Sequence, residues 1–94
     1  MEPLKENQII DHISDIEGWN YAEDKIFKEF HFNDFKEALA FILRVGFEAE
    51  SLNHHPEIIN VYNRVSIGLQ THDAGNKVSI KDIELARDIE ALLV

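Results

Sequence analysis

The change of hydrophobic period along the chain is the feature that most constrains its fold. In three segments, apolar residues recur at three- and four-residue steps, which places them on one face of an amphipathic helix. These predicted helices cover residues 5–16, 34–51 and 79–93. The second begins with Asp34 and Glu37 and the third with Ser79 and Asp82, two pairs whose spacing resembles a capping box at a helix start.

Between the predicted helices, the pattern changes to that of strands. Residues 25–32 alternate between two sets of side chains, and residues 58–62 and 65–71 are rich in β-branched and apolar residues. Residues 19–21 are expected to supply a short hairpin partner for 25–32. The order predicts an α+β fold (α-β-β-α-β-β-α), with a four-stranded antiparallel sheet and three helices on one face.

The length and composition of the chain limit its class. Ninety-four residues predict a single domain, residues 1–94, whose core is thin enough that self-association is a fair expectation. The formal net charge of −9 argues against unaided binding to nucleic acid or to an anionic membrane. Because the chain has no cysteine, disulfides, thiolate metal sites and a cysteine nucleophile are excluded. Without an apolar run of ~20 residues or a signal-peptide pattern, we expect a cytoplasmic protein with no membrane contact.

Three of the five histidines are predicted to meet at one end of the second pair of strands. With a turn centred on Asn63 and Arg64, the pairing places His55 opposite His72, and His54 lies next to His55. Directly opposed residues of antiparallel strands have Cβ atoms about 4.5–5.5 Å apart. The imidazole rings are therefore expected at the open end of this hairpin, close to the end of the long second helix.

A cluster of three imidazoles is compatible with three interpretations. Histidine exchanges protons near neutral pH, so one ring can act as base while another acts as acid. Three neutral imidazoles can also bind zinc with water as the fourth ligand, although the adjacent side chains of His54 and His55 diverge, which weighs against a shared ion. In the third interpretation the histidines lie in a polar loop and have no joint role. Spacing alone leaves all three open.

A longer set of residues resembles the signature of the pterin-4a-carbinolamine dehydratase family. That signature consists of an acid, three spacers and His-His-Pro, followed by an aromatic residue, a later histidine and a later aspartate. The matching segments are Glu50-Ser51-Leu52-Asn53-His54-His55-Pro56, Asn60-Val61-Tyr62-Asn63, Thr71-His72-Asp73 and Asp82. The similarity extends from about Trp19 to the C-terminus and is weakest in the first predicted helix.

The resemblance implies an enzyme, a hydro-lyase that removes water from a 4a-hydroxytetrahydropterin. The product is quinonoid dihydropterin, which a reductase returns to tetrahydropterin, so that the reaction supports tetrahydrobiopterin recycling. The family uses no metal and no organic cofactor, and it assembles as homodimers or, often, homotetramers. Its fold is the α-β-β-α-β-β-α layer that the hydrophobic pattern predicts.

The resemblance also implies a role for each matching residue. We expect His54 and His72 to flank the pterin carbon C4a and to act as acid and base. His55 is expected chiefly to bind and orient the pterin. Further contacts to the substrate are implied for Pro56, Thr71, Asp73 and the backbone at Ala74. Supporting roles are implied for Glu50, Asp82 and Trp19.

Other classes of function remain as alternatives. The first is a protein-binding module, because vertebrate relatives of the family also act as dimerisation partners of a homeodomain transcription factor through helical surfaces. The second is a metal-dependent hydrolase, which metal analysis of the purified protein would separate from a dehydratase. The third is an assembly protein with a decayed site, which the intact set of three histidines disfavours.

Overall fold

The computed structural model describes residues 1–93 and confirms the predicted order of helices and strands. The elements are α1 (Glu6–Ile13), β1 (Asn20–Ala22), β2 (Lys25–His31), α2 (Phe35–Ser51), β3 (Glu57–Val61), β4 (Arg64–Leu69), the short 3₁₀ helix η1 (His72–Ala74) and α3 (Ile80–Ala91). The hydrophobic pattern does not predict η1, because three residues are too few to establish a period.

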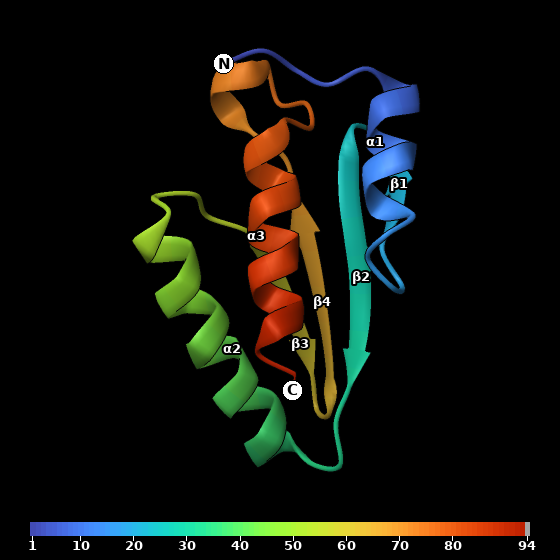
Figure 1. The fold of residues 1–94 in the computed structure, drawn as a ribbon. Helices are drawn as coiled ribbons and strands as arrows, with labels where there is room; N and C mark the ends of the chain where they lie inside the picture. Colours follow the sequence, from blue (N-terminus) through green and yellow to red (C-terminus); the bar gives the residue numbers. More distant parts are fainter. Residues whose placement is uncertain (94) are drawn as a thin grey trace.

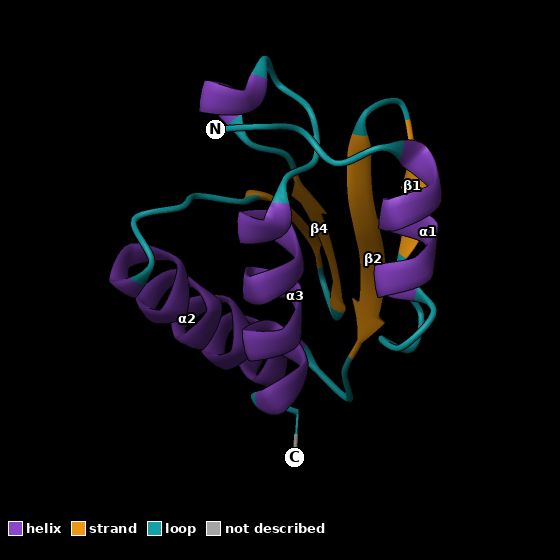
Figure 2. Cartoon of the chain, turned by 45° about the horizontal axis from the view of Figure 1, so that its top comes forward, coloured by secondary structure: helices purple, strands orange, loops and turns teal. Residues whose placement is uncertain are grey.

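The four strands form one antiparallel sheet in the order β1-β2-β4-β3. The connection through α2 carries the chain past β2 and leaves room for β4 between β2 and β3. Figure 1 shows the three helices in front of this sheet, and the turned view in Figure 2 shows them as a separate layer. The predicted α+β architecture is therefore confirmed.

The core lies between the inner face of the sheet and the helices. Alternate residues of the two central strands are buried there: Ile26 and Phe30 in β2, and Val65, Ile67 and Leu69 in β4. The helices add Ile9, Ile13, Ala38, Phe41, Val45, Ala49, Ile83, Leu85, Ala86 and Ile89. The outer face of the sheet carries no helix, so its side chains are exposed or half-buried.

The first helix is shorter than predicted. It ends at Ile13, where a tight turn begins and the Ile16 backbone N–H donates to the Ile13 carbonyl. Ile16 is nevertheless buried, so the apolar period continues into a segment that is not helical. A period of three to four residues indicates which side chains face the core. It does not by itself distinguish a helix from a turn that follows the helix.

The turn between β3 and β4 is centred one residue earlier than predicted, on Tyr62 and Asn63, so that Val61 pairs with Arg64. This shifts the pairing by two positions and leaves Val65 and Ile67 buried on the inner face of the sheet, whereas Tyr62, expected within the strand, is exposed in the turn. The reason lies outside the hairpin, because the Asn63 side chain donates to the Phe32 carbonyl and the Asn63 carbonyl accepts from the Phe32 N–H. These contacts to the end of β2 fix Asn63 in the turn.

Side-chain caps fix the starts of the two longer helices. Asp34 accepts a hydrogen bond from the Glu37 N–H at 2.8 Å, while the Glu37 carboxylate reaches back to the Asn33 N–H rather than to Asp34. At α3, Ser79 and Asp82 form the predicted capping box. The α3 cap is the more important for the site, because its acid is fully buried.

Within residues 1–93, no helix is both long and apolar enough to span a bilayer.

Candidate active site

Three chain segments converge at the end of the sheet where β4 terminates. The first is the loop between α2 and β3, which carries His54, His55 and Pro56, the second is the end of β4 with η1, and the third is the start of α3. The outcome matches the expectation that the histidines meet at the open end of the hairpin. They do not meet as a strand pair, however, because β3 begins only at Glu57 and His72 already lies in η1.

The C-terminal cap of α2 places His54 in the site. Asn53 has a φ of +52°, in the left-handed region that asparagine tolerates better than most residues. Its N–H donates to the Glu50 carbonyl, and the His54 N–H donates to the Ala49 carbonyl. Together these bonds form a Schellman motif, which turns the chain sharply at the helix end. The turn directs His54 inward, so that it is buried while His55 is exposed.

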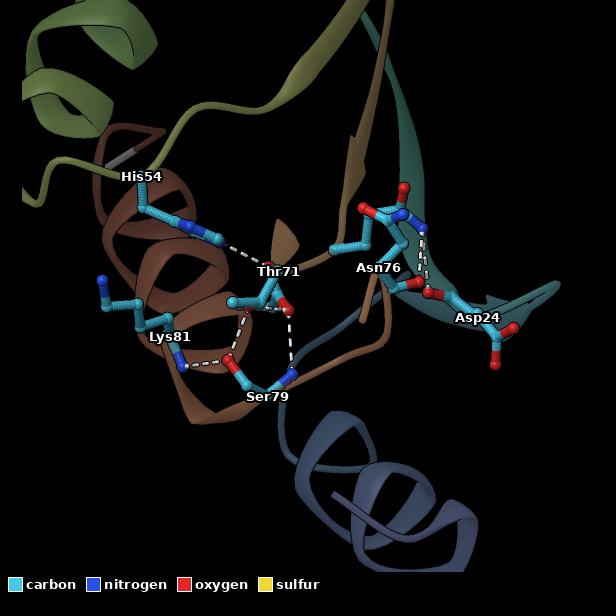
Figure 3. A network of polar contacts seen from close by, with 8 residues as sticks. Asp24, His54, Thr71, Asn76, Ser79 and Lys81 are labelled. Carbon is cyan, nitrogen blue, oxygen red and sulfur yellow. Dashed lines mark hydrogen bonds and ion pairs between the residues drawn. The ribbon is translucent and has the colours of Figure 1, made fainter. Parts of the chain in front are cut away.

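His54 belongs to a buried network of polar contacts, drawn in Figure 3. Its Nε2 lies 2.5 Å from Oδ1 of Asp82, whose side chain is fully buried. The other oxygen of Asp82 accepts from the Thr71 hydroxyl at 2.8 Å and from the Ser79 N–H at 2.9 Å. The Thr71 and Ser79 hydroxyl oxygens are 2.6 Å apart.

The direction of each bond in this network follows from the donors available. An ionised carboxylate only accepts, so the Nε2 of His54 carries the proton and Thr71 donates its single hydroxyl proton to Asp82. The Ser79 hydroxyl must then donate to Thr71. Within the described residues no buried side-chain nitrogen or oxygen is left without a partner. With Nε2 engaged by Asp82, the Nδ1 of His54 is the nitrogen left to meet a ligand.

The other two histidines are held by exposed partners. Nε2 of His55 lies 2.8 Å from Oε1 of Glu50, and both side chains are more than half exposed. Nδ1 of His72 lies 3.1 Å from Oδ1 of Asn76, an amide rather than a carboxylate. Since an amide oxygen accepts a proton donor, Nδ1 of His72 carries the proton and its Nε2 is the nitrogen left to accept one.

All three histidines line one hollow of about 210 Å³. Its other lining residues are Asn53, Gln70, Thr71, Asp73 and Lys81. A second hollow of about 290 Å³ adjoins it and shares His55, Gln70 and His72. Pro56 lines this second hollow, as a wall residue would, and Glu50 reaches the site only through His55.

Thr71 and Ala74, both expected to contact the substrate, have buried side chains that take part in the framework of the site. The Thr71 hydroxyl proton is committed to Asp82, and Thr71 is almost completely buried. The Ala74 N–H donates to the Thr71 carbonyl, and the Ala74 side chain is buried. Both residues therefore hold the site together. The exposed Asp73 is the member of this segment whose side chain faces the hollow without such a commitment.

Trp19, for which a supporting role is implied, is buried in the hydrophobic core. Its ring packs edge-on against Phe30, and its indole N–H donates to Glu90 at 3.0 Å. Glu90 lies two turns of α3 beyond Asp82, and Trp19 lines neither hollow beside the histidines. The contact between Trp19 and Glu90 joins residues 71 positions apart, which no local pattern predicts.

Sequence reasoning missed several polar residues of the site. Ser79 is visible in the sequence as a helix cap, but its hydroxyl contact to Thr71 is not. Gln70 and Asn76 are joined by a bond from the Gln70 side chain to the Asn76 carbonyl, which closes the loop around His72. The left-handed Gly75 and Asn76 are the signal that could have indicated this tight loop.

The described part of the chain, residues 1–93, brings together no group of three histidine or acidic side chains arranged to hold a metal ion.

Comparison with known proteins decides the family. The family model described as pterin 4 alpha carbinolamine dehydratase matches residues 2–92. This chain belongs to the pterin carbinolamine dehydratase family. A relative from Opitutus terrae, named "Putative pterin-4-alpha-carbinolamine dehydratase", is 50% identical over 80 residues, covering 85% of this chain and 82% of the relative. A relative of the same name from Christiangramia forsetii is 44% identical, covering 99% and 95% of the two chains.

Solved structures of dehydratase relatives have the same fold. A protein of Brucella melitensis described as a transcriptional coactivator/pterin dehydratase superposes with a TM-score of 0.90 at 36% identity, covering 96% of this chain and 97% of that one. A pterin dehydratase-like protein described as a RuBisCO assembly factor of the alpha-carboxysome superposes with a TM-score of 0.68 at 21% identity, covering 82% and 90%. The second likeness shows the fold alone. The dehydratase family's reaction, loss of water from a pterin intermediate, makes its enzymes lyases.

Proposed function

We propose that this chain dehydrates 4a-hydroxytetrahydropterin to quinonoid dihydropterin by general acid and base catalysis from histidine. The observation that carries the proposal is that His54, His55 and His72 line one hollow large enough to admit part of a flat heterocycle. The family membership of the chain gives the substrate class. Tetrahydrobiopterin recycling and a cytoplasmic location complete the proposal, and the absence of cysteine is in keeping with that location.

The reaction needs two proton transfers. The hydroxyl at carbon C4a leaves as water when its oxygen gains a proton, and nitrogen N5 loses its proton as the C4a=N5 double bond forms. Each transfer assisted by a positioned acid or base is typically worth about 10²–10⁴-fold in rate. Two imidazoles on opposite sides of the ring can supply both transfers without a metal or an organic cofactor.

The partners of the histidines favour one division of labour. A positive charge on His54 is stabilised by the buried Asp82 carboxylate 2.5 Å away, so His54 is the residue we assign to protonating the leaving hydroxyl. His72 has an amide partner and an available Nε2, so we assign it to accepting the N5 proton. For a substrate with its hydroxyl on the opposite ring face, the two residues exchange roles.

His55 and Asp73 complete the proposed site as binding residues. His55 is exposed, lines both hollows and is oriented by Glu50, which suits it to holding the pterin rather than to moving its protons. Asp73 offers a carboxylate at the edge of the smaller hollow. A carboxylate there can accept hydrogen bonds from the amino and ring N–H groups of a pterin.

We also propose that the chain assembles into homodimers or homotetramers through α2. Its exposed side carries Phe35, Leu39, Leu43 and Phe47 at four-residue steps, with relative exposures of 45%, 46%, 65% and 71%. We call these four residues the α2 stripe. A row of large apolar side chains along one helix is typical of a surface that another helix covers.

The second candidate function is a protein-binding module that uses the same α2 stripe. The Brucella melitensis protein is described as a transcriptional coactivator as well as a dehydratase. The observation that favours this candidate is the exposed stripe itself, which could cover a helix of another protein instead of a second copy of this chain. Binding of that kind does not need the histidines.

The test is the absorbance change of a chemically prepared carbinolamine, followed with and without the purified chain. The proposal predicts a rate proportional to protein concentration and well above the spontaneous decay. A protein that leaves the decay rate unchanged at micromolar concentration would exclude the dehydratase and leave the binding module as the candidate.

A further inference from the structure

The loop that follows β4 folds back on itself and brings Asn76 beside His72. Gly75 and Asn76 both have a left-handed backbone, with φ values of +74° and +60°, which glycine and asparagine tolerate better than most residues. The Asn76 N–H donates to the Thr71 carbonyl at 3.1 Å, and the Gly75 N–H donates to the His72 carbonyl at 3.0 Å. This return of the chain places Oδ1 of Asn76 3.1 Å from Nδ1 of His72.

Gln70 holds Asn76 from the other side. Its side-chain nitrogen Nε2 donates to two carbonyls, that of Asn76 at 3.0 Å and that of Asp24 at 3.3 Å. Figure 3 shows Asn76 and Asp24 next to each other at this point. Asp24 belongs to the turn between β1 and β2, and its carboxylate lies 3.4 Å from the Lys77 ammonium. The loop is therefore attached to this turn both before and after His72.

The acceptor beside a histidine determines which ring nitrogen carries the proton. In the proposed reaction, the base must present an unprotonated nitrogen to the proton on N5 of the pterin, so a neutral His72 must carry its own proton on Nδ1. The amide oxygen of Asn76 holds the proton there without adding a charge. His54 differs, because its partner is the Asp82 carboxylate, which favours the cation. The two partners therefore separate the base from the acid.

We infer that Asn76 and Gln70 are positioning residues for His72, Asn76 by setting the tautomer of the imidazole and Gln70 by holding Asn76 in place. This inference rests on the proposed dehydratase function. Neither residue belongs to the segments of this chain that match the dehydratase signature, so the contacts alone assign these roles. Gln70 lines both hollows, and the test therefore separates its action through Asn76 from a direct contact with the pterin.

Two substitutions of Asn76 leave every other group around His72 in place. The ionisable side chains that line the same hollows as His72 come from five segments and are His54 and His55 before β3, Asp73 of η1, Lys81 of α3, Lys25 of β2 and Glu57 of β3. Asn76→Asp keeps an accepting oxygen and adds a negative charge beside Nδ1 of His72. Asn76→Gly removes the acceptor and keeps a residue that tolerates the left-handed backbone.

The test measures the tautomer of His72 and the kinetics of each variant. ¹⁵N chemical shifts of the ring in the free chain are expected to place the proton of neutral His72 on Nδ1 in the wild type. Asn76→Gly is expected to move it partly to Nε2 and to lower kcat about fivefold. Asn76→Asp is expected to keep the wild-type tautomer.

The pH profile of Asn76→Asp supplies a second readout. A carboxylate beside Nδ1 stabilises the imidazolium, so the pH below which kcat/KM falls is expected to move upward by about one unit. The shift is expected for the C4a epimer from which His72 removes the N5 proton. Asn76→Asp carries the test if thermal melting shows that Asn76→Gly is unfolded.

A charge control and a double variant make the test specific. Gln8→Glu adds a negative charge on α1 and keeps the oxygen that accepts from the Lys5 N–H, so wild-type kinetics are expected. Gln70→Met removes the donor, keeps the length of the side chain and is expected to lower kcat less than Asn76→Gly does. In the chain with both substitutions, kcat should equal that of Asn76→Gly alone, because Gln70 acts through Asn76.

The outcomes separate the positioning roles from the reaction. If the wild-type chain dehydrates the carbinolamine and both Asn76 variants keep its kcat, pH profile and His72 tautomer, the inference is overturned and the dehydratase function stands. If the losses from Gln70→Met and Asn76→Gly multiply in the doubly substituted chain, the role of Gln70 through Asn76 is overturned. If the wild-type chain does not dehydrate the carbinolamine, the dehydratase function fails and the positioning roles fail with it.

Discussion

Nε2 of His54 and Oδ1 of Asp82 lie 2.5 Å apart, at a point where the carboxylate is completely buried. The contact joins the end of α2 to the start of α3, two helices whose termini need polar partners in any case. Asp82 both caps α3 and positions His54: one of its oxygens accepts from the Ser79 N–H, and the other contacts the His54 ring. Folding of α3 and orientation of the imidazole are thereby coupled through one side chain.

Replacing Asp82 by Asn is expected to lower kcat about a hundredfold or more. An amide has one accepting oxygen, which Thr71 and Ser79 engage, so its N–H₂ group turns to His54 and forces the proton from Nε2 to Nδ1. The measurement is kcat over a range of pH, together with ¹⁵N chemical shifts of the His54 ring that report its tautomer. Glu84→Gln, which removes an exposed acid from the same helix, is the control. Wild-type kcat and an unchanged tautomer in Asp82→Asn would refute the positioning role.

Replacing Thr71 by Val is expected to destabilise the fold by about 1–3 kcal/mol. The substitution keeps the shape of the side chain but leaves the buried Ser79 hydroxyl without its acceptor and removes one donor from Asp82. Urea unfolding monitored by Trp19 fluorescence measures the change. Thr71→Ser restores the hydroxyl and is expected to recover most of the loss. Equal stability of Thr71→Val and wild type would show that the hydroxyl pair contributes nothing.

Replacing Leu43 by Glu is expected to dissociate the assembly proposed for this chain. Leu43 is in the middle of the α2 stripe and is 65% exposed in the single chain, so a charge there costs little unless a second copy covers it. Sedimentation velocity of the wild type should give a species larger than one chain, and the variant should give the monomer. Ile10→Glu places the same charge on an exposed apolar position of α1 and should remain assembled. A monomeric wild type would contradict the proposal.

Local periodicity was sufficient to predict the layer architecture. In β2 the alternation is confirmed, because Ile26 and Phe30 are buried, whereas α2 buries one apolar side and leaves the α2 stripe exposed. The predicted meeting of the histidines also holds, although the register of β3 and β4 differs by two positions. The prediction holds because the loop before β3 and the segment after β4 lie at the same end of the sheet. The histidines in these two segments are therefore close to one another whichever of the two registers β3 and β4 adopt.

Contacts between residues far apart in the sequence account for what could not be predicted. The turn at Tyr62 and Asn63 depends on bonds to Phe32, and the place of Trp19 depends on Glu90. The commitment of the Thr71 hydroxyl to Asp82 is of the same kind. Such contacts depend on the three-dimensional arrangement, and no spacing within one segment encodes them.

The most direct test of the account is the kcat for carbinolamine dehydration by chains in which His54 or His72 is replaced by Ala. His31, an exposed histidine of β2 outside both hollows, supplies the matched control His31→Ala. The account predicts that kcat falls about 10²–10⁴-fold in each of the two site variants and stays at the wild-type value in the control. Wild-type kcat in both His54→Ala and His72→Ala would contradict it.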